Sequence, residues 1–198
     1  MHRQDELCEI LLRTGSLEFG TFKLSKGILS PYYVDLRLIL GDSQAFQSVI
    51  SMYRSIIEPV LIKRVQRLAS MPIAGIAYGA VLAYELSTPF LYVRRELRGT
   101  ERSVEGLLHQ GDNVLVLDDI ATSGETIVEA VEAIRAEGGI VKDAVVLLDR
   151  QQGGGENLRK TGIRLHAFTT MRRIADRLLS LGTIDERQHK EILGQIVN

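Results

Sequence analysis

The sequence predicts an α/β fold: an open parallel sheet with helices on both faces. Short apolar runs alternate with helical patterns through most of the 198-residue chain, and strand–helix alternation is typical of such sheets. The runs are continuous in Val, Ile and Leu, as expected for strands that are buried on both faces. The length indicates a single domain over residues 1–198. In this fold, ligands bind beyond the carboxyl ends of the strands.

The N-terminal segment predicts a helix followed by two short strands. Apolar residues on one helical face are followed by a glycine stop signal: Leu7, Ile10, Leu11 and Gly15. Residues 19–24 and 32–36 have strand character, with a turn through Lys26 and Gly27 between them. Residues 43–68 have a helical pattern that Pro59 must break or kink.

The core pattern lies in residues 43–170, and two helices are expected in residues 171–198. The expected core strands are residues 73–77, 89–93, 113–117 and 143–148, with helical patterns at 80–86 and 125–137. Thr183 and Glu186 have the spacing of a capping box for the last helix.

Bulk properties exclude several classes of protein. The formal net charge of -1 gives no global basic field for nucleic acid. No apolar stretch approaches membrane-spanning length, and the acidic start lacks the apolar run of a signal peptide. A single cysteine, Cys8, allows no intrachain disulfide. We expect a cytoplasmic protein that binds neither nucleic acid nor membrane.

The strongest functional signal is a strand that ends in Asp118 and Asp119. A loop of small and hydroxyl residues follows, and a helix begins near Gly124. Unpaired N–H groups at a helix start suit a phosphate. The carboxylates suit vicinal sugar hydroxyls or a hydrated Mg²⁺. The alternative is a purely structural role, in which a strand end is followed by a helix and the aspartates serve only as caps. That role does not require two aspartates and a hydroxyl-rich loop.

This segment resembles the phosphoribosyl pyrophosphate motif of type I phosphoribosyltransferases. The resemblance implies that Asp118 and Asp119 hold the ribose hydroxyls and contact Mg²⁺ through water. It also implies that a loop wraps the 5-phosphate. The residues assigned to this loop are Ile120, Ala121, Thr122, Ser123, Gly124, Glu125 and Thr126.

Two further segments resemble the family's pyrophosphate-binding loops. Residues 73–80 read as a strand, a glycine loop and a helix start, with Tyr78 and Gly79 at the loop tip. Residues 94–102 hold four arginines and two acids. A charge run is usually a solvated face, but arginine also binds phosphate in bidentate fashion. The resemblance implies a catalytic loop that reaches into the partner's site in a homodimer. Its binding residues would be Arg94, Arg95, Arg98 and Thr100, with the three arginines catalytic.

The chain departs from the family pattern in these loops. Thr100 stands where the family has a histidine, and Gly79 where it often has a lysine. Arginine cannot donate a proton near neutral pH. The electrostatic role of the loop is therefore retained, whereas a proton-transfer role is not supported.

The hood segment, residues 1–40, resembles that of orotate phosphoribosyltransferases. The shared elements are Phe19-Gly20, Ser25-Lys26-Gly27 and Ser30-Pro31-Tyr32-Tyr33, and Leu148-Asp149-Arg150 also matches. The implied orotate-binding residues are Lys26, Tyr32, Tyr33, Thr122 and Arg150. Lys26 is offset by one position from the family lysine, which would turn its side chain to the other face of a strand.

The resemblance covers nearly the whole chain and implies transfer of a phosphoribosyl group to orotate, with Mg²⁺. One alternative is a purine phosphoribosyltransferase, which would not need Arg150 or the hood hairpin. The other is a non-catalytic sensor of phosphoribosyl pyrophosphate, which would need a DNA-binding segment. Residues before the first core helix predict a hairpin and no helix-turn-helix.

Overall fold

The computed structural model describes residues 3–23, 29–60, 64–94 and 103–197. The helices are α1 (Arg3–Arg13), the 3₁₀ helix η2 (Leu36–Gly41), α2 (Ser43–Val60), α3 (Ala74–Glu85), α4 (Glu125–Ala136), α5 (Gly154–Lys160), α6 (Met171–Ser180) and α7 (Glu186–Leu193). The strands are β1 (Leu17–Lys23), β2 (Leu29–Val34), β3 (Arg67–Ser70), β4 (Phe90–Val93), β5 (Val104–Glu105), β6 (Asn113–Ala121), β7 (Ile140–Asp149) and β8 (Arg164–Thr170).

The core is a six-stranded sheet in the order β5-β4-β3-β6-β7-β8. Its described pairings are parallel except that of β4 with β5, which closes one edge as an antiparallel strand. The order reverses direction around β3 and β6, so the carboxyl ends of these central strands face a crevice. The predicted parallel α/β sheet is therefore confirmed.

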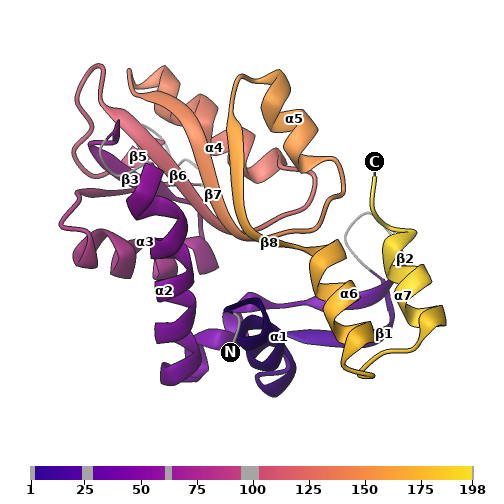
Figure 1. Cartoon of the computed structure of the whole chain (residues 1–198). Helices are drawn as coiled ribbons and strands as arrows, with labels where there is room; N and C mark the ends of the chain where they lie inside the picture. The colour runs from indigo at the N-terminus through magenta and orange to yellow at the C-terminus, as the bar shows by residue number, and fades with distance from the viewer. Residues whose placement is uncertain (1–2, 24–28, 61–63, 95–102, 198) are drawn as a thin grey trace.

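Side chains alternate between the two faces of the sheet along its central strands. Leu115 and Leu117 of β6 pack in a cluster with α2 and α3, whereas Val114 and Val116 pack in a second cluster with α4 and α5. Figure 1 shows α4 and α5 on the side of the sheet away from α2 and α3. This alternation explains the continuous apolar runs, because both faces of each strand are covered.

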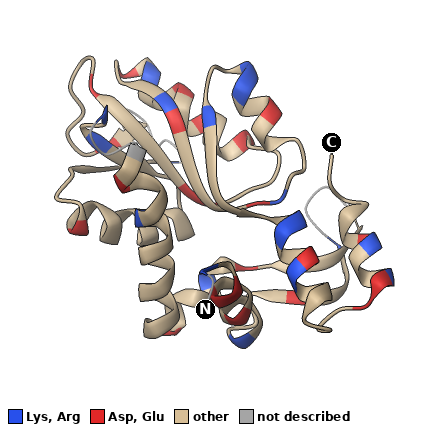
Figure 2. Cartoon of the chain, viewed as in Figure 1, with Lys and Arg blue, Asp and Glu red and all other residues tan. Residues whose placement is uncertain are grey.

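The N-terminal helix and hairpin lie beside the C-terminal helices (Figure 1). α6 contacts α1 and α7 contacts β2, and the ring of His189 in α7 lies 2.7 Å from the Asp176 carboxylate in α6. Acidic and basic residues are interspersed along α6 and α7 (Figure 2). The division into a hood, a core and C-terminal helices remains a prediction. The contacts of α6 with α1 and of α7 with β2 bring the N-terminal segment and the C-terminal helices together.

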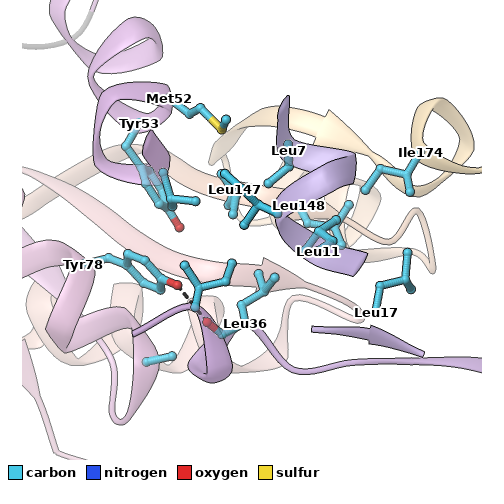
Figure 3. Packing of buried hydrophobic residues seen from close by; sticks show 14 of the residues in the cluster. Leu7, Leu11, Leu17, Leu36, Met52, Tyr53, Tyr78, Leu147, Leu148 and Ile174 are labelled. Atoms are coloured by element: carbon cyan, nitrogen blue, oxygen red, sulfur yellow. Dashed lines mark hydrogen bonds between the residues drawn. The ribbon is translucent and has the colours of Figure 1, made fainter. Parts of the chain in front are cut away.

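One hydrophobic cluster joins this region to the sheet. Figure 3 shows side chains of α1 and β1 packed toward those of α2, α3 and β7. The fully buried members include Leu7, Leu11, Tyr53, Tyr78 and Leu147. The hairpin is therefore fixed against the carboxyl edge of the sheet by a continuous core.

Several predicted element bounds were wrong. The helix predicted at 43–68 ends at Val60, and β3 lies at Arg67–Ser70. Residues 73–77 form the start of α3 rather than a strand, because a short apolar run fits a buried helix as well as a strand. The last helix is capped by Asp185 with Gln188, not by Thr183 with Glu186. A carboxylate at this position accepts the N–H of Gln188 at 2.7 Å and also favours the helix dipole.

Candidate active site

The two aspartates lie in the last third of β6, which extends to Ala121 rather than ending at Leu117. Asp118 is buried, and its carbonyl oxygen accepts a 2.8 Å hydrogen bond from the Tyr53 hydroxyl in α2. Asp118 Oδ1 accepts from Asp119 N, and Asp119 Oδ1 accepts from Ile120 N, each at 3.0 Å. These backbone contacts orient both carboxylates at the carboxyl end of the central strand.

The first turn of α3 packs closely against this strand end. A Cβ atom on Gly75 would lie 2.9 Å from Asp118 Oδ1 and 3.3 Å from the carbonyl oxygen of Leu117. Only glycine fits this separation without displacing a neighbour. Gly75 therefore brings the segment that precedes α3 up to the aspartates.

The loop after β6 turns into α4 at Gly124, which has a φ of 78°. A Cβ atom there would lie 3.1 Å from the carbonyl oxygen of Gly154, at the start of α5. Asn157 of α5 donates a 2.9 Å hydrogen bond to the carbonyl oxygen of Ser123. The loop is thus held from outside by α5, while the N–H groups of the first turn of α4 give its other side a partial positive charge.

These segments surround one cavity of about 320 Å³. Its lining residues are Val34, Asp35, Leu36, Arg37, Pro72, Ile73, Ala74, Asp118, Asp119, Ile120, Thr122, Ser123, Gly124, Glu125, Thr126 and Ile127. The predicted aspartates and six of the seven predicted loop residues are therefore brought together. The seventh, Ala121, is buried, and its carbonyl oxygen accepts a hydrogen bond from Arg150 N.

The wall contributed by residues 34–37 was not predicted. Asp35 accepts 2.7 Å hydrogen bonds from both Nε and Nη2 of Arg37. The Arg37 guanidinium lowers the pKa of the Asp35 carboxyl, and the pair is a bidentate ion pair at the cavity edge. The only sequence signal was the short Asp-Leu-Arg spacing after the hairpin.

Asp119 lines the cavity, and protein surrounds most of its carboxyl group. Loss of water around this carboxyl raises its pKa above the ordinary value, and the charge of Asp35 adds to the effect. Hydrogen bonds from Ile120 N and within the Asp-Asp pair act in the opposite direction. An acceptor in this setting gains free energy when a cation or hydroxyl donors approach it.

Arg150 lies next to the cavity, just beyond β7. Its side chain is 6% exposed, and its Nε donates a 3.2 Å hydrogen bond to the Tyr32 hydroxyl of β2. The guanidinium carbon is 4.7 Å from the centre of the Tyr32 ring. Nη2 is buried and has no hydrogen-bond partner among the described residues. A buried guanidinium edge without a partner is costly unless a ligand supplies one.

Named proteins of similar sequence cover almost the whole chain. It is 39% identical over 193 residues to an orotate phosphoribosyltransferase of Pyrobaculum islandicum, covering 96% of this chain and 97% of that protein. It is 36% identical to an orotate phosphoribosyltransferase of Cenarchaeum symbiosum, with 96% and 97% covered. The chain belongs to the orotate phosphoribosyltransferase family. No protein-family model matches it.

The fold agrees with this family. The crystal structure of orotate phosphoribosyltransferase from Aeropyrum pernix superposes with a TM-score of 0.81 at 34% identity, covering 90% of this chain and 99% of that one. Within the described parts of the chain, no helix combines the length and the apolar composition that a membrane crossing needs.

The predicted position of the family's pyrophosphate loop was wrong. Tyr78 and Gly79 are not at a loop tip but are buried inside α3. Tyr78 donates a 2.8 Å hydrogen bond to the carbonyl oxygen of Leu36, and a Cβ on Gly79 would collide with Ser70 and Phe90. Burial raises the pKa of the Tyr78 hydroxyl. The segment that reaches the cavity is instead Pro72, Ile73 and Ala74, and Ile73 is largely exposed.

The predicted catalytic loop is described only at its two ends. Arg94 N donates to the carbonyl oxygen of Ser103, and Arg94 Nε donates to Glu105 Oε1 at 2.6 Å. The structure therefore places Arg94 in an ion pair at the base of the loop, where β4 and β5 pair. Arg95, Arg98 and Thr100 lie outside the described residues.

The hairpin residues predicted to bind the base differ in their surroundings. Tyr32 is fully buried against Arg150, whereas Tyr33 is largely on the surface, with its ring centre 5.6 Å from that of Phe22. Lys26 lies outside the described residues. Thr122 lines the cavity. It directly follows Ala121, whose carbonyl oxygen accepts the hydrogen bond from Arg150 N.

The donor set at the cavity fits Mg²⁺ held through water. Its acidic oxygen atoms come from Asp35, Asp118, Asp119 and Glu125, and Mg²⁺ prefers oxygen ligands and retains several waters. In the described residues, no group of three or more His, Cys, Asp or Glu side chains is arranged to hold a metal directly. The site therefore suits a hydrated ion bound together with a phosphorylated ligand.

Proposed function

We propose that this chain transfers the 5-phosphoribosyl group of phosphoribosyl pyrophosphate to orotate, giving orotidine 5'-monophosphate and pyrophosphate, a step of pyrimidine biosynthesis. The observation that carries the proposal is the juxtaposition of two sites. A backbone hydrogen bond from Arg150 N to the carbonyl oxygen of Ala121 links the sugar-phosphate cavity at the end of β6 to the residue that carries the buried guanidinium. A ligand with a phosphoribosyl group and a planar carboxylate fits both.

Each part of the substrate has a matching set of residues. The N-terminal turn of α4, with Thr122, Ser123 and Thr126, would bind the 5-phosphate. Asp118 and Asp119 would accept hydrogen bonds from the ribose hydroxyls. Arg150 would pair with the orotate carboxylate through Nη2, the buried guanidinium nitrogen that has no hydrogen-bond partner among the described residues.

The reaction exchanges two bonds at C1 of the ribose. The bond to pyrophosphate breaks and the leaving group takes the electron pair, while N1 of orotate bonds to C1 and its proton passes to the departing pyrophosphate or to water. The described residues offer positioning and fixed charge, and catalysis of this kind comes from orientation and electrostatic preorganisation. Mg²⁺, when bound, would supply charge neutralisation for the pyrophosphate.

The active protein is, in this proposal, a homodimer. Arg95 and Arg98 belong to a loop whose family counterpart acts across the subunit interface. The pairing of Val93 with Val104 and of Arg94 with Glu105 supports a loop that leaves the sheet edge from a fixed base. The loop arginines would then stabilise the departing pyrophosphate of the neighbouring subunit.

The test is a panel of bases incubated with the protein, phosphoribosyl pyrophosphate and Mg²⁺, followed by absorbance and product chromatography. Orotate should be converted, and adenine, guanine and uracil should not. Conversion of adenine or guanine in place of orotate would favour a purine phosphoribosyltransferase. Binding of phosphoribosyl pyrophosphate without turnover of any base would favour a sensor.

A further inference from the structure

Acidic side chains outnumber basic ones among the described residues that line the cavity, although the proposed ligand carries a phosphate and a pyrophosphate. Four acidic side chains line it, namely Asp35, Asp118, Asp119 and Glu125. Among the described residues that line it, Arg37 is the one that is basic. A polyanion needs cationic groups near it, so the position of Arg37 bears directly on how such a ligand binds.

Arg37 is held in place but is open to a ligand. Two bonds to Asp35 use the Nε and Nη2 edge of its guanidinium, and Nη1 has no hydrogen-bond partner among the described residues. The side chain is 53% exposed. A guanidinium fixed by one carboxylate loses little further conformational freedom when a phosphate oxygen approaches its other edge.

The backbone next to Arg37 is fixed to α3, the helix whose first residue also lines the cavity. The carbonyl oxygen of Leu36 accepts the hydrogen bond from Tyr78 in α3, and α3 begins at Ala74, the last of the cavity-lining residues 72–74. In the proposed function, residues 122–126 take the 5-phosphate and Asp118 and Asp119 take the ribose. The segments that remain, 34–37 and 72–74, face the rest of the substrate.

We infer that Arg37 binds the pyrophosphate group of phosphoribosyl pyrophosphate, as a cation supplied by the same subunit. The inference rests on the proposed function and adds to it a residue of the hood segment. Asp35 acts as the positioning residue, because its carboxylate orients the guanidinium. The site would then use one fixed arginine from its own chain in addition to any charge from the loop at residues 94–102.

The experiment compares two ligands and two variants by calorimetry in the presence of Mg²⁺. Phosphoribosyl pyrophosphate carries the pyrophosphate, whereas ribose 5-phosphate lacks it. Arg37→Gln removes the proposed contact. Arg13→Gln is the matched control, because Arg13 is also 53% exposed and also paired with an aspartate, Asp42, away from this cavity. Both variants change the net charge equally.

Arg37→Gln should weaken phosphoribosyl pyrophosphate binding by at least about tenfold and leave ribose 5-phosphate binding within about twofold. Arg13→Gln should change neither. Arg37→Lys keeps the charge without the bidentate fork, and its affinity should lie between those of the unmodified protein and Arg37→Gln.

Equal affinity of Arg37→Gln and the unmodified protein for phosphoribosyl pyrophosphate would overturn the inference. So would an equal loss for both ligands, because that would place Arg37 at the ribose phosphate or in the structure of the wall. Neither result touches the proposed function, which fails separately if the unmodified protein does not convert orotate. A protein that binds no phosphoribosyl pyrophosphate would overturn both.

Discussion

Asp119 meets two opposing requirements at the end of β6. Its carboxylate is positioned to accept hydrogen bonds from a sugar or from water on Mg²⁺, yet its surroundings raise its pKa. Because the folded-state pKa lies above the unfolded one, the stability that this group contributes is fully present below the ordinary aspartate pKa. It is lost as the pH rises through the raised value. At neutral pH the charged carboxylate therefore costs folding free energy.

Asp119→Asn should separate these two roles. The variant removes the buried charge, so at pH 7 its Tm should equal or exceed that of the unmodified protein. The difference should shrink as the pH falls through the raised pKa of Asp119 and should vanish below the ordinary aspartate pKa. Loss of a charged hydrogen-bond acceptor costs about 1.5–3 kcal/mol, so kcat/KM should fall by about 10- to 100-fold. A lower Tm with unchanged kcat/KM would show that the carboxylate is structural.

At the scale of single residues, the sequence predicted those cavity-lining residues that are neighbours along the chain. Asp118, Asp119 and the loop after them were predicted because one strand and one helix start deliver them together. Arg37 was missed because it reaches the cavity through a contact between distant segments, the Tyr78 to Leu36 hydrogen bond. The hydrophobic periodicity of a sequence carries no information about a contact between segments that are distant along the chain.

At the scale of elements, the approach of α3 to β6 sets the shape of the cavity. The separation depends on Gly75, because a Cβ atom there would lie 2.9 Å from Asp118 Oδ1 and 3.3 Å from the carbonyl oxygen of Leu117. These atoms belong to a buried strand, so they cannot move as a surface side chain does.

Gly75→Ala should push the first turn of α3 away from β6. Overpacking of this kind costs about 1–3 kcal/mol of stability, and the displaced segment at residues 72–74 should raise the KM for phosphoribosyl pyrophosphate. Gly155→Ala in α5 is the control, since nothing lies within 4 Å of its Cβ position. That control should leave the KM unchanged and hold or raise the Tm, because alanine favours a helix. Equal effects of the two changes on the KM would contradict the account.

The elements that sequence patterns predicted well are those with a long, single periodicity. β6, β7 and α4 were predicted within a few residues of their bounds, and the two helices expected in residues 171–198 are present as α6 and α7. The segment from residue 67 to 80 was misassigned, because Arg67–Ser70 is only four residues long and the Ala- and Gly-rich stretch after it is a buried helix. The pyrophosphate loop was placed on Tyr78 and Gly79 as a direct consequence.

At the scale of the whole molecule, the two ends of the chain pack against each other beside the sheet. α6 packs on α1 and α7 on β2, and one hydrophobic cluster runs from these elements to β7. The sequence predicted the hairpin and the helices separately. Their association depends on side-chain packing between residues more than a hundred positions apart, which local patterns do not contain.

Subunit mixing tests whether two chains share each active site. Arg98→Ala impairs the loop and Asp119→Asn impairs the sugar pocket, so each homodimer should keep at most about a tenth of the unmodified activity. After dissociation and reassociation in equal amounts, half of the dimers should be mixed, and each would contain one intact site. Activity should return to about a quarter of the unmodified level, as expected for a two-fold symmetric dimer. Subunit exchange without recovered activity would mean that the loop serves its own chain.

The central claim is that the buried edge of Arg150 selects orotate by its carboxylate. The most direct measurement is the ratio of kcat/KM for orotate to that for uracil, which lacks this group. The unmodified protein should show a ratio of at least about 10⁴, because uracil would leave the guanidinium without its partner. Arg150→Ala should reduce the ratio to about 10² or less, mainly through loss of orotate activity. Arg67→Ala is the control, because Arg67 is also buried but pairs with Asp112 where β3 begins, and it should keep the ratio. A ratio near one in the unmodified protein, or one unchanged by Arg150→Ala in a folded variant, would contradict the account.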